Sequence, residues 1–176
     1  NRQIKDIENL VNEFSNFARM PQPIFKKINI IEILNRSVDF VKMTSKNKIE
    51  IISDHKELII NGDADQLNRV FINLIKNSEE AFLDVLKKNP DFKGKIDIAI
   101  INNNDYILVR LTDNGTGISD TKKVMTPYFT TKTNGTGLGL PIVNKIINEH
   151  SGDFTIQNKG NGKGVNVEIF FPKINA

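Results

Sequence analysis

A single long amphipathic helix, predicted between Asp63 and Pro90, constrains the fold more than any other part of the sequence. Its apolar residues recur every three or four positions and share one face, which needs a hydrophobic surface to cover it. That predicted buried face consists of Leu67, Val70, Phe71, Leu74, Ala81 and Val85. Asp63, with Gln66 three residues later, is typical of a capping box that starts a helix. The chain must therefore supply a second layer against which this helix packs.

Segments typical of β-strands lie on both sides of the long helix and provide that layer. The predicted strands span residues 49–53, 58–60, 96–101, 107–111, 154–157 and 165–171. A second helix is predicted over residues 30–43, with an inner face of Ile30, Ile33, Leu34, Val38 and Val41. A third helix follows the glycine-rich stretch 113–140 and ends near Ser151. This order of elements favours an α+β domain with helices on one face of a mixed sheet.

The first twenty residues form a separate pattern, a heptad repeat of apolar side chains. Its members are Ile4, Ile7, Val11, Phe14 and Ala18, with Leu10 and Phe17 beside them. The helix is predicted to stop near Met20, because Pro21 and Pro23 follow and disfavour helix. A helix this short cannot bury such a face alone, so it needs a partner helix from another copy or from chain outside this sequence. The alternative is a terminal helix that packs on its own domain.

Composition argues against several classes of function. The 176 residues include 24 basic and 21 acidic side chains, and the net charge of +3 is too small to indicate a nucleic-acid partner. There is no cysteine, so we expect neither disulfides nor thiolate-bound zinc, as in a reducing cytoplasm. No apolar run reaches the roughly 18 residues that span a bilayer, so we expect a cytoplasmic domain.

The long helix carries two asparagines, Asn73 and Asn77, which are four residues apart and therefore on one face. An asparagine carbonyl oxygen is a neutral, hard ligand that suits Mg²⁺ already carrying phosphate and water. Asparagines on a helix surface are more often simply solvated, so the pair carries weight only in combination with other motifs.

A turn with two glycines follows the predicted strand at residues 107–111. In the sequence Asp113-Asn114-Gly115-Thr116-Gly117-Ile118, the glycines allow the backbone to approach a ligand closely. Asp113, at the strand end, can accept a hydrogen bond from an exocyclic amine. The alternative is an ordinary turn that ends a strand.

A third motif, Gly135-Thr136-Gly137-Leu138-Gly139-Leu140, opens the last helix. Its exposed backbone N–H groups and the positive end of the helix dipole suit a phosphate. It is not the dinucleotide fingerprint, because the third glycine comes too early and no βαβ unit surrounds it. It is not a P-loop either, because the Gly-Lys-Ser/Thr ending is missing.

The order of these motifs resembles one family. The two asparagines, the Asp113 turn, the segment Pro127-Tyr128-Phe129-Thr130-Thr131-Lys132 and the glycine-rich helix start follow one another as in the ATP-binding catalytic domain of sensor histidine kinases. That domain belongs to the superfamily that includes gyrase, Hsp90 and MutL. The resemblance covers residues 24–172 and implies a two-layer α/β sandwich, the Bergerat ATP-binding fold.

The resemblance also implies roles for individual residues. Asn77 would ligate Mg²⁺, Asn73 would support the phosphate end of the cleft, and Asp113 would bind the adenine amine. Residues 118–134 would form a lid over ATP, with Phe129 docking the lid onto a partner helix. The full predicted set of ATP-binding residues is Asn73, Asn77, Asp113, Gly115, Gly117, Ile118, Thr130, Thr131, Lys132, Gly135, Thr136, Gly137, Leu138, Gly139 and Leu140. We expect a poorly ordered lid without nucleotide, because the lid has little to bury.

The sequence departs from the common kinase pattern close to Asn77. Glu80 and Ala81 stand where many relatives carry lysine and tyrosine, so we expect Lys132 to supply the missing charge. Asn73 stands where ATP-hydrolysing relatives such as gyrase have a glutamate as general base, and an amide cannot take a proton. The sequence therefore favours phosphoryl transfer to a protein group. An ATPase of the gyrase, Hsp90 or MutL kind, an anti-sigma-type serine kinase and a nucleotide-sensing module are the alternatives.

Residues 12–21 and 127–132 together are similar to the nitrogen-regulation sensor kinases of the NtrY type. The resemblance implies that residues 1–22 are the end of a dimerisation and phosphoacceptor hairpin, and residues 23–176 the ATP-binding domain. The implied partners are the hairpin with its phosphoacceptor histidine, the receiver domain of a response regulator, and a second subunit. The full-length protein would be a homodimer anchored in the bacterial inner membrane.

Neither of the two histidines has the sequence context of a phosphoacceptor. His55 lies in a polar link between strands and is expected to be solvated. His150 ends the third helix, where an imidazolium suits the helix dipole and Gly152 supplies the cap. We therefore expect this chain to bind ATP without phosphorylating itself.

Overall fold

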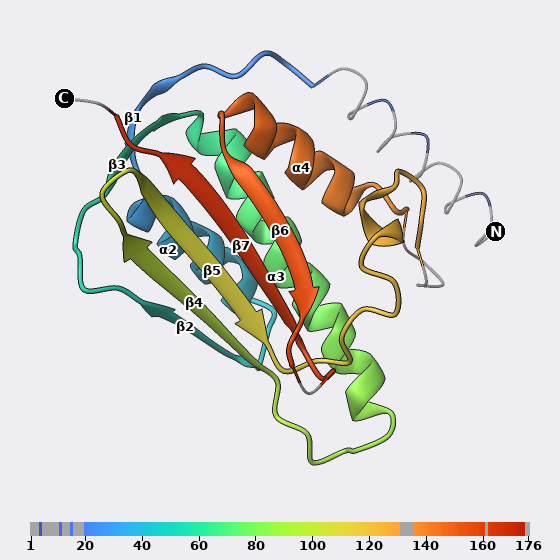
Figure 1. The fold of residues 1–176 in the computed structure, drawn as a ribbon. Coiled ribbons are helices and arrows are strands. Elements are labelled where there is room, and N and C mark those ends of the chain that lie inside the picture. The colour runs from blue at the N-terminus through green and yellow to red at the C-terminus, as the bar shows by residue number, and fades with distance from the viewer. Residues whose placement is uncertain are drawn as a thin grey trace.

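The long helix that the sequence predicts is present, in the middle of a layer of helices packed on a sheet (Figure 1). The computed structural model describes Ile4, Val11, Ser15 and residues 20–130, 136–160 and 162–174. The elements in chain order are β1 (Lys26–Asn29), α2 (Ile30–Lys42), β2 (Lys48–Ile52), β3 (Ile59–Gly62), α3 (Ala64–Leu86), β4 (Lys95–Asn102), β5 (Tyr106–Asp113), the short 3₁₀ helix η1 (Lys123–Met125), α4 (Gly139–Glu149), β6 (Asp153–Asn158) and β7 (Val165–Pro172).

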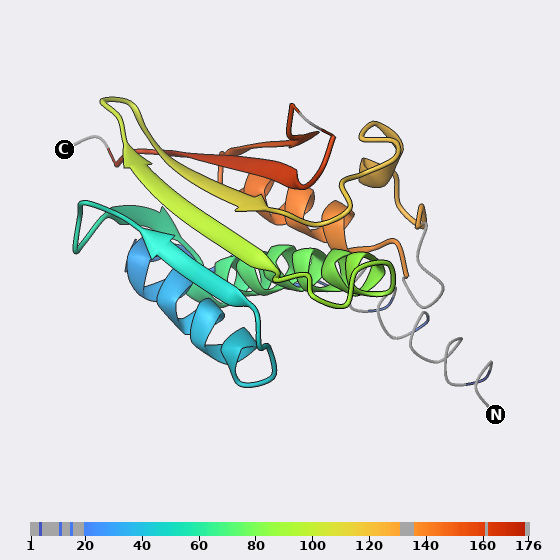
Figure 2. The same cartoon turned by 90° about the horizontal axis from the view of Figure 1, so that it is seen from below.

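Five strands form the main sheet in the order β2-β4-β5-β7-β6. β2 and β4 run parallel, and the other neighbouring pairs are antiparallel. β1 and β3 form a separate two-stranded antiparallel sheet. Seen from below, α2, α3 and α4 lie on one side of the main sheet (Figure 2). This arrangement confirms the predicted two-layer sandwich with helices on one face of a mixed sheet.

The core fills the space between the two layers. All five residues predicted on the inner face of α2 are buried. The buried residues of α3 are Gln66, Leu67, Val70, Phe71, Leu74, Ile75, Ser78 and Phe82. The prediction was wrong for Ala81 and Val85, which are half-buried. Each residue turns a helix by about 100°, so Ser78 and Phe82 hold the inward positions and Ala81 lies to one side of them.

β1 and η1 are elements that the sequence patterns did not predict. β1 has only four residues, two of them exposed lysines, so its alternation is too short to mark a strand. β1 is a strand because it pairs with β3, in a register that places Lys26 opposite Gly62 and Asn29 opposite Ile59. A strand of this kind depends on a partner far along the chain and not on its own pattern.

The start of α3 is capped by Asp63, as predicted, but the predicted capping box is incomplete. The Asp63 carboxylate accepts hydrogen bonds from the N–H groups of Asp65 and Gln66, at 3.0 and 3.1 Å. The Gln66 side chain does not return to the N–H of Asp63, since its Nε2 donates instead to the carbonyl of Pro21 at 3.0 Å. The Asp63 N–H donates to Nε2 of His150 across 2.9 Å. An imidazole from α4 therefore replaces the second half of the box.

His150 is buried, and both nitrogens of its ring are engaged. Nδ1 lies 2.7 Å from the carbonyl oxygen of Ile146, and a carbonyl can only accept, so Nδ1 carries a proton. Nε2 accepts from Asp63 and carries none, so the ring is neutral and the predicted imidazolium is wrong. Gly152 does contribute to the cap, because its N–H donates to the carbonyl of Ile147 at 2.9 Å, whereas Ser151 takes the left-handed conformation with φ 55°. Gly152 also allows the carbonyl of Phe170 to approach closely.

The segment before β1 is held at this same corner. The N–H of Ile24 donates to the Asp63 carboxylate at 2.8 Å, and the Phe25 ring lies 5.1 Å from the His150 ring. Farther toward the N-terminus the structure describes Ile4, Val11 and Ser15, all helical, and the other members of the heptad repeat lie outside the described residues. Across the described part of the chain, every helix is too short or too polar to span a bilayer.

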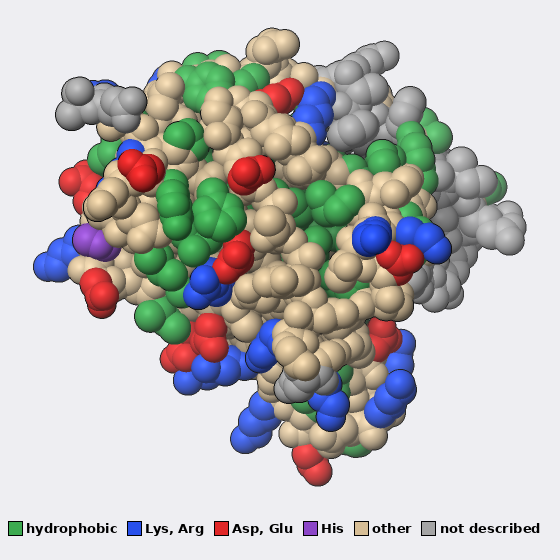
Figure 3. All heavy atoms as spheres, viewed as in Figure 1, with side chains coloured by type: hydrophobic (Ala, Val, Ile, Leu, Met, Phe, Trp, Pro, Cys, Tyr) green, Lys and Arg blue, Asp and Glu red, His purple; other side chains and the backbone are tan. Residues whose placement is uncertain are grey.

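Among the described residues, no helix covers the other face of the main sheet, which Figure 3 shows from outside. Charged side chains pair there, along one strand in the contact of Lys95 with Asp97 on β4 at 2.8 Å and across neighbouring strands in that of Arg110 with Glu168 at 2.7 Å. The alternation of β4 and β5 thus places polar groups outward and apolar groups toward the helices.

Candidate functional site

A cavity of about 1110 Å³ lies between α3, the end of β5, the loop after β5 and the start of α4. Its volume is slightly above the roughly 300–1,000 Å³ typical of small-ligand sites. The predicted site residues that line it are Asn73, Asn77, Asp113, Gly117, Ile118, Thr130, Thr136, Gly137, Gly139 and Leu140. Three motifs that are far apart in the sequence therefore meet around one cavity.

Five of the predicted site residues do not line the cavity within the described structure. Gly115 is buried beside it, and Leu138 is fully buried in the core, where it holds the start of α4. Thr131, Lys132 and Gly135 lie outside the described residues, as does residue 134 at the end of the predicted lid.

Asp113 is the most constrained polar group of the site. Its carboxylate is buried, with 4% of the residue exposed. One oxygen accepts from the N–H groups of Gly115 at 2.8 Å and Val165 at 3.2 Å, and the other accepts from the Ser78 hydroxyl at 2.9 Å. These three donors fix the direction of the carboxylate at the end of β5. A carboxylate in this setting can still accept a further hydrogen bond from a ligand amine.

The loop after Asp113 is held close to α3 and β6. A side chain at Gly115 would place its Cβ 2.9 Å from the Cβ of Ala81, so only glycine fits beside α3. Gly117 has a φ of +80°, which favours glycine. Ile118 is fixed by Asn158, whose amide accepts from the Ile118 N–H and donates to the Ile118 carbonyl, both at 2.7 Å.

Asn158 is a site-positioning residue that the sequence reasoning missed. It follows Phe154 and Ile156 in the alternation of β6 and occupies the inward register of that strand. A polar side chain at an inward position needs a hydrogen-bond partner, and this signal could have identified Asn158 before the structure was known.

The lid and the start of α4 meet at Gly137. The N–H of Tyr128 donates to the Gly137 carbonyl at 3.1 Å. Gly137 has a φ of +70°, and a Cβ there would lie 2.5 Å from the carbonyl carbon of Tyr128 and 2.8 Å from the N of Phe129. Phe129 is half-buried and lines the cavity. The described part of the lid is therefore anchored by backbone contact with the glycine-rich motif.

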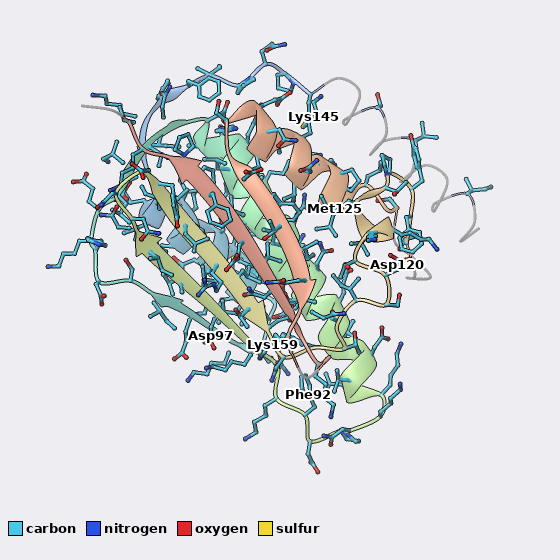
Figure 4. All side chains as sticks on the ribbon, in the orientation of Figure 1. Phe92, Asp97, Asp120, Met125, Lys145 and Lys159 are labelled. Atoms are coloured by element: carbon cyan, nitrogen blue, oxygen red, sulfur yellow. The ribbon has the colours of Figure 1, made fainter. Side chains whose placement is uncertain are left out.

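Figure 4 shows the position of this loop. Asp120 and Met125 belong to the part that borders the first half of α4, and Lys145 lies farther along that helix. The N–H groups of Lys122 and Lys123 both donate to the Asp120 carboxylate at 3.1 Å. The hydrogen bond from the Lys123 N–H is the main cause that lowers the pKa of Asp120, and its effect exceeds the opposing effect of desolvation. Asp120 thus acts as a cap that shapes the turn before η1.

The cavity wall offers amide oxygen and backbone N–H groups, not a preformed metal cluster. Within the described residues, no group of three or more histidine, cysteine or carboxylate residues could hold a metal ion. A metal at this site would take most of its ligands from phosphate and water. The amide of Asn77, on the cavity wall, is the kind of neutral oxygen ligand that such an ion accepts.

Comparison with known proteins places the chain in one family. Residues 62–175 match the family model described as histidine kinase-, DNA gyrase B- and HSP90-like ATPase. The chain belongs to this family. The matched region runs from the start of α3 through the end of β7 and contains every predicted site residue. Membership of this family supports ATP binding by the chain.

Two curated relatives match the chain over almost its whole length. Over 173 residues the chain is 35% identical to an NtrY-like sensor histidine kinase of Rickettsia conorii, covering 97% of this chain and 28% of that protein. Over 175 residues it is 31% identical to the nitrogen regulation protein NtrY of Azorhizobium caulinodans, covering 96% of this chain and 22% of that protein. The chain thus spans less than a third of the length of these curated relatives.

The solved structures agree with the sequence relatives. The catalytic domain of the histidine kinase ThkA superposes with a TM-score of 0.72 at 29% identity, covering 85% of this chain and 98% of that one. These similarities favour the histidine kinase prediction over an ATPase of the gyrase, Hsp90 or MutL kind and over an anti-sigma-type serine kinase.

Proposed function

We propose that this chain is the ATP-binding catalytic part of a sensor histidine kinase of the NtrY type. Its task is to bind Mg²⁺–ATP and to present the γ-phosphate to a histidine of a phosphoacceptor hairpin. The observation that carries the proposal is the convergence of Asn77, Asp113 and Gly137 on one cavity. The catalysis asked of such a domain is mostly positioning and charge neutralisation.

The adenine end of the site is proposed to lie at Asp113. Its carboxylate is oriented by Ser78, Gly115 and Val165, so it can accept a hydrogen bond from the exocyclic amine without reorganising. Ala81 borders the same space, and its small side chain leaves room for the base between α3 and the loop after β5.

The triphosphate end is proposed to lie between Asn77 and the start of α4. Gly137 and Gly139 line the cavity there, and the N-terminus of a helix favours a bound phosphate. Asn77 is the proposed ligand of Mg²⁺, which would neutralise phosphate charge when bound. Asn73 lies one turn away on the same wall, and its amide cannot act as a general base, which supports transfer over hydrolysis.

The acceptor of the phosphoryl group is proposed to lie outside this chain. His55 lies in an exposed turn, and both ring nitrogens of buried His150 are already hydrogen-bonded. We propose that residues 1–22 end the phosphoacceptor hairpin, and that a response regulator receives the phosphoryl group. The whole protein, on this proposal, is a dimer anchored in the membrane.

Titration with Mg²⁺–ATP tests the binding site. The wild-type chain should bind, Asp113→Asn should lose most of the affinity, and Asn77→Asp should change the metal dependence. The control is Asn166→Ala, on the outer face of the sheet, which should bind as the wild type does. Normal binding by both site variants would show that the site assignment is wrong.

Addition of labelled ATP and a separate histidine-bearing hairpin tests the kinase function. Label should appear on the hairpin histidine and not on this chain. Rapid hydrolysis of ATP by the isolated chain, with no label on the hairpin, would instead identify an ATPase.

A further inference from the structure

α3 carries a third polar residue in line with the two asparagines of the site. Arg69, Asn73 and Asn77 follow one another at intervals of four residues, and all three line the cavity. Residues four apart share one face of a helix, with about 6 Å of rise between them. The three side chains therefore form a row along the cavity wall that ends at Arg69.

The direction of a bound nucleotide follows from the contacts at either end of this row. The adenine end is fixed by Asp113, which is bonded to Ser78, so it lies on the C-terminal side of Asn77. α4 packs on α3 and runs antiparallel to it, because His150 at the end of α4 contacts Asp63 at the start of α3. The α4 start, about 16 Å from its end, thus lies beside the middle of α3. The phosphates would extend from there toward Arg69.

Arg69 also differs from the other arginines of the described structure. Arg36 pairs with Asp65 at 3.6 Å and Arg110 pairs with Glu168 at 2.7 Å. Within the described residues, no carboxylate lies within 4.0 Å of Arg69, which is half-buried at the cavity wall. An unpaired guanidinium in a cavity is suited to a bidentate contact with a phosphate.

The other described cations of the cavity wall are placed less favourably. The Lys76 ammonium lies over the ring of Phe40, 5.8 Å from its centre, and the Lys87 ammonium pairs with Asp84 at 2.8 Å. Lys88 lies beyond the end of α3, on the far side of the adenine end. The position three residues after Asn77 carries a carboxylate, that of Glu80.

We propose that Arg69 is a further ATP-binding residue, which contacts the terminal phosphate and so distinguishes ATP from ADP. The inference rests on the proposed function and adds a residue to it that the sequence motifs do not mark. A guanidinium at this position would also stabilise the charge on the terminal phosphoryl group during transfer.

Calorimetric titration of the chain with Mg²⁺–ATP and with Mg²⁺–ADP tests this assignment. Arg69→Gln keeps much of the side-chain length and removes the charge, so it should weaken ATP binding about tenfold or more and ADP binding less than twofold. Arg69→Lys should recover part of the loss. The matched control is Arg36→Gln, whose arginine lies on α2 and pairs on the surface, and which should bind both nucleotides as the wild type does.

Equal losses for ATP and ADP, or no loss for either, would overturn the role of Arg69 while leaving the proposed function intact. Failure of the wild-type chain to bind either nucleotide would instead refute the proposed function itself.

Discussion

The backbone N–H of Asp63 donates a hydrogen bond to Nε2 of His150 across 2.9 Å, and this bond joins the start of α3 to the end of α4. These two helices both line the cavity, with Asn73 and Asn77 on one and Gly139 on the other. The imidazole is also fixed from its own helix, because Nδ1 donates to the carbonyl of Ile146. The bond therefore sets the relative position of the two helices that form the site.

Replacement of His150 tests how much this bond contributes to stability. His150→Phe keeps a ring against Phe25 but leaves the Asp63 N–H without an acceptor, at an expected cost of about 1–3 kcal/mol in the free energy of unfolding. His150→Ala also opens a cavity and should cost more, about 2–4 kcal/mol. His55→Ala, at an exposed position, is the control and should stay within about 0.5 kcal/mol of the wild type.

Urea unfolding followed by circular dichroism measures these differences, since the chain has no tryptophan to report by fluorescence. Equal stabilities of His150→Phe and the wild type would show that the hydrogen bond to Asp63 contributes nothing.

Asp63 should make the stability of the domain fall in acid. Partial burial acts to raise the pKa of its carboxyl, but the N–H groups of Ile24, Gln66 and Asp65 that donate to it lower the pKa below the ordinary value of 3.8. The folded state therefore stabilises the ionised form of the Asp63 carboxyl more than the unfolded state does. Its contribution is complete above the unfolded pKa and is lost as the pH falls through the folded pKa.

Asp63→Asn keeps an oxygen for the cap and removes the titration. The unfolding free energy of this variant should fall less steeply than that of the wild type below about pH 4. Urea denaturation at a series of pH values between about 2 and 7 gives both curves. Parallel curves across the acid range would refute a special role of Asp63.

Sequence periodicity predicted the order of the main elements because each helix and long strand has a buried face of its own. It failed for β1, whose strand conformation depends on pairing with β3. It also failed for Gln66, because the Asp63 N–H that Gln66 was expected to bind donates instead to His150, 87 residues after Asp63. The predicted buried face of α3 was also wrong near Ala81, because a shift of one residue along a helix moves a side chain from the centre of the buried face to its edge.

The site was predicted more completely than the contacts that support it. Asn73, Asn77 and Asp113 were marked by local motifs, and they do line one cavity. Ser78 and Asn158 hold that site through hydrogen bonds to residues 35 and 40 positions away, which no local motif records. Arg69 falls outside the motifs for a different reason, since its meaning depends on its place on the cavity wall, where no carboxylate of the described residues pairs with it.

Alanine substitutions at two glycines of the phosphate motif should change stability and ATP binding independently of each other. Gly137→Ala forces a methyl group against the backbone of Tyr128 and Phe129 and a side chain into a positive φ, at a cost of about 1–3 kcal/mol. It should also weaken ATP binding, because the lid is anchored there. Gly139→Ala meets no atom within 4 Å and starts a helix, so it should keep or raise stability by up to about 1 kcal/mol.

A methyl group at residue 139 would nevertheless stand in the cavity that is proposed to hold the phosphates. Gly139→Ala should therefore bind ATP more weakly than the wild type while unfolding at the same or a higher urea concentration. Gly160→Ala, also without a neighbour within 4 Å, is the control and should change neither property. Wild-type ATP affinity in Gly139→Ala would place the phosphates elsewhere.

Asn158 offers the sharpest test of how the adenine end is held, because its amide makes two hydrogen bonds of 2.7 Å to the backbone of Ile118. Asn158→Ala removes both and should cost about 1–3 kcal/mol in unfolding free energy. It should also weaken ATP binding by about tenfold, since Ile118 lines the cavity and follows the Asp113 turn.

Asn158→Asp retains the bond from the Ile118 N–H but places a carboxylate against the Ile118 carbonyl, so it should recover none of the affinity. Asn166→Ala loses one bond to Thr112 on the outer face and should bind normally, and equal ATP affinities for all three variants would exclude a positioning role for Asn158.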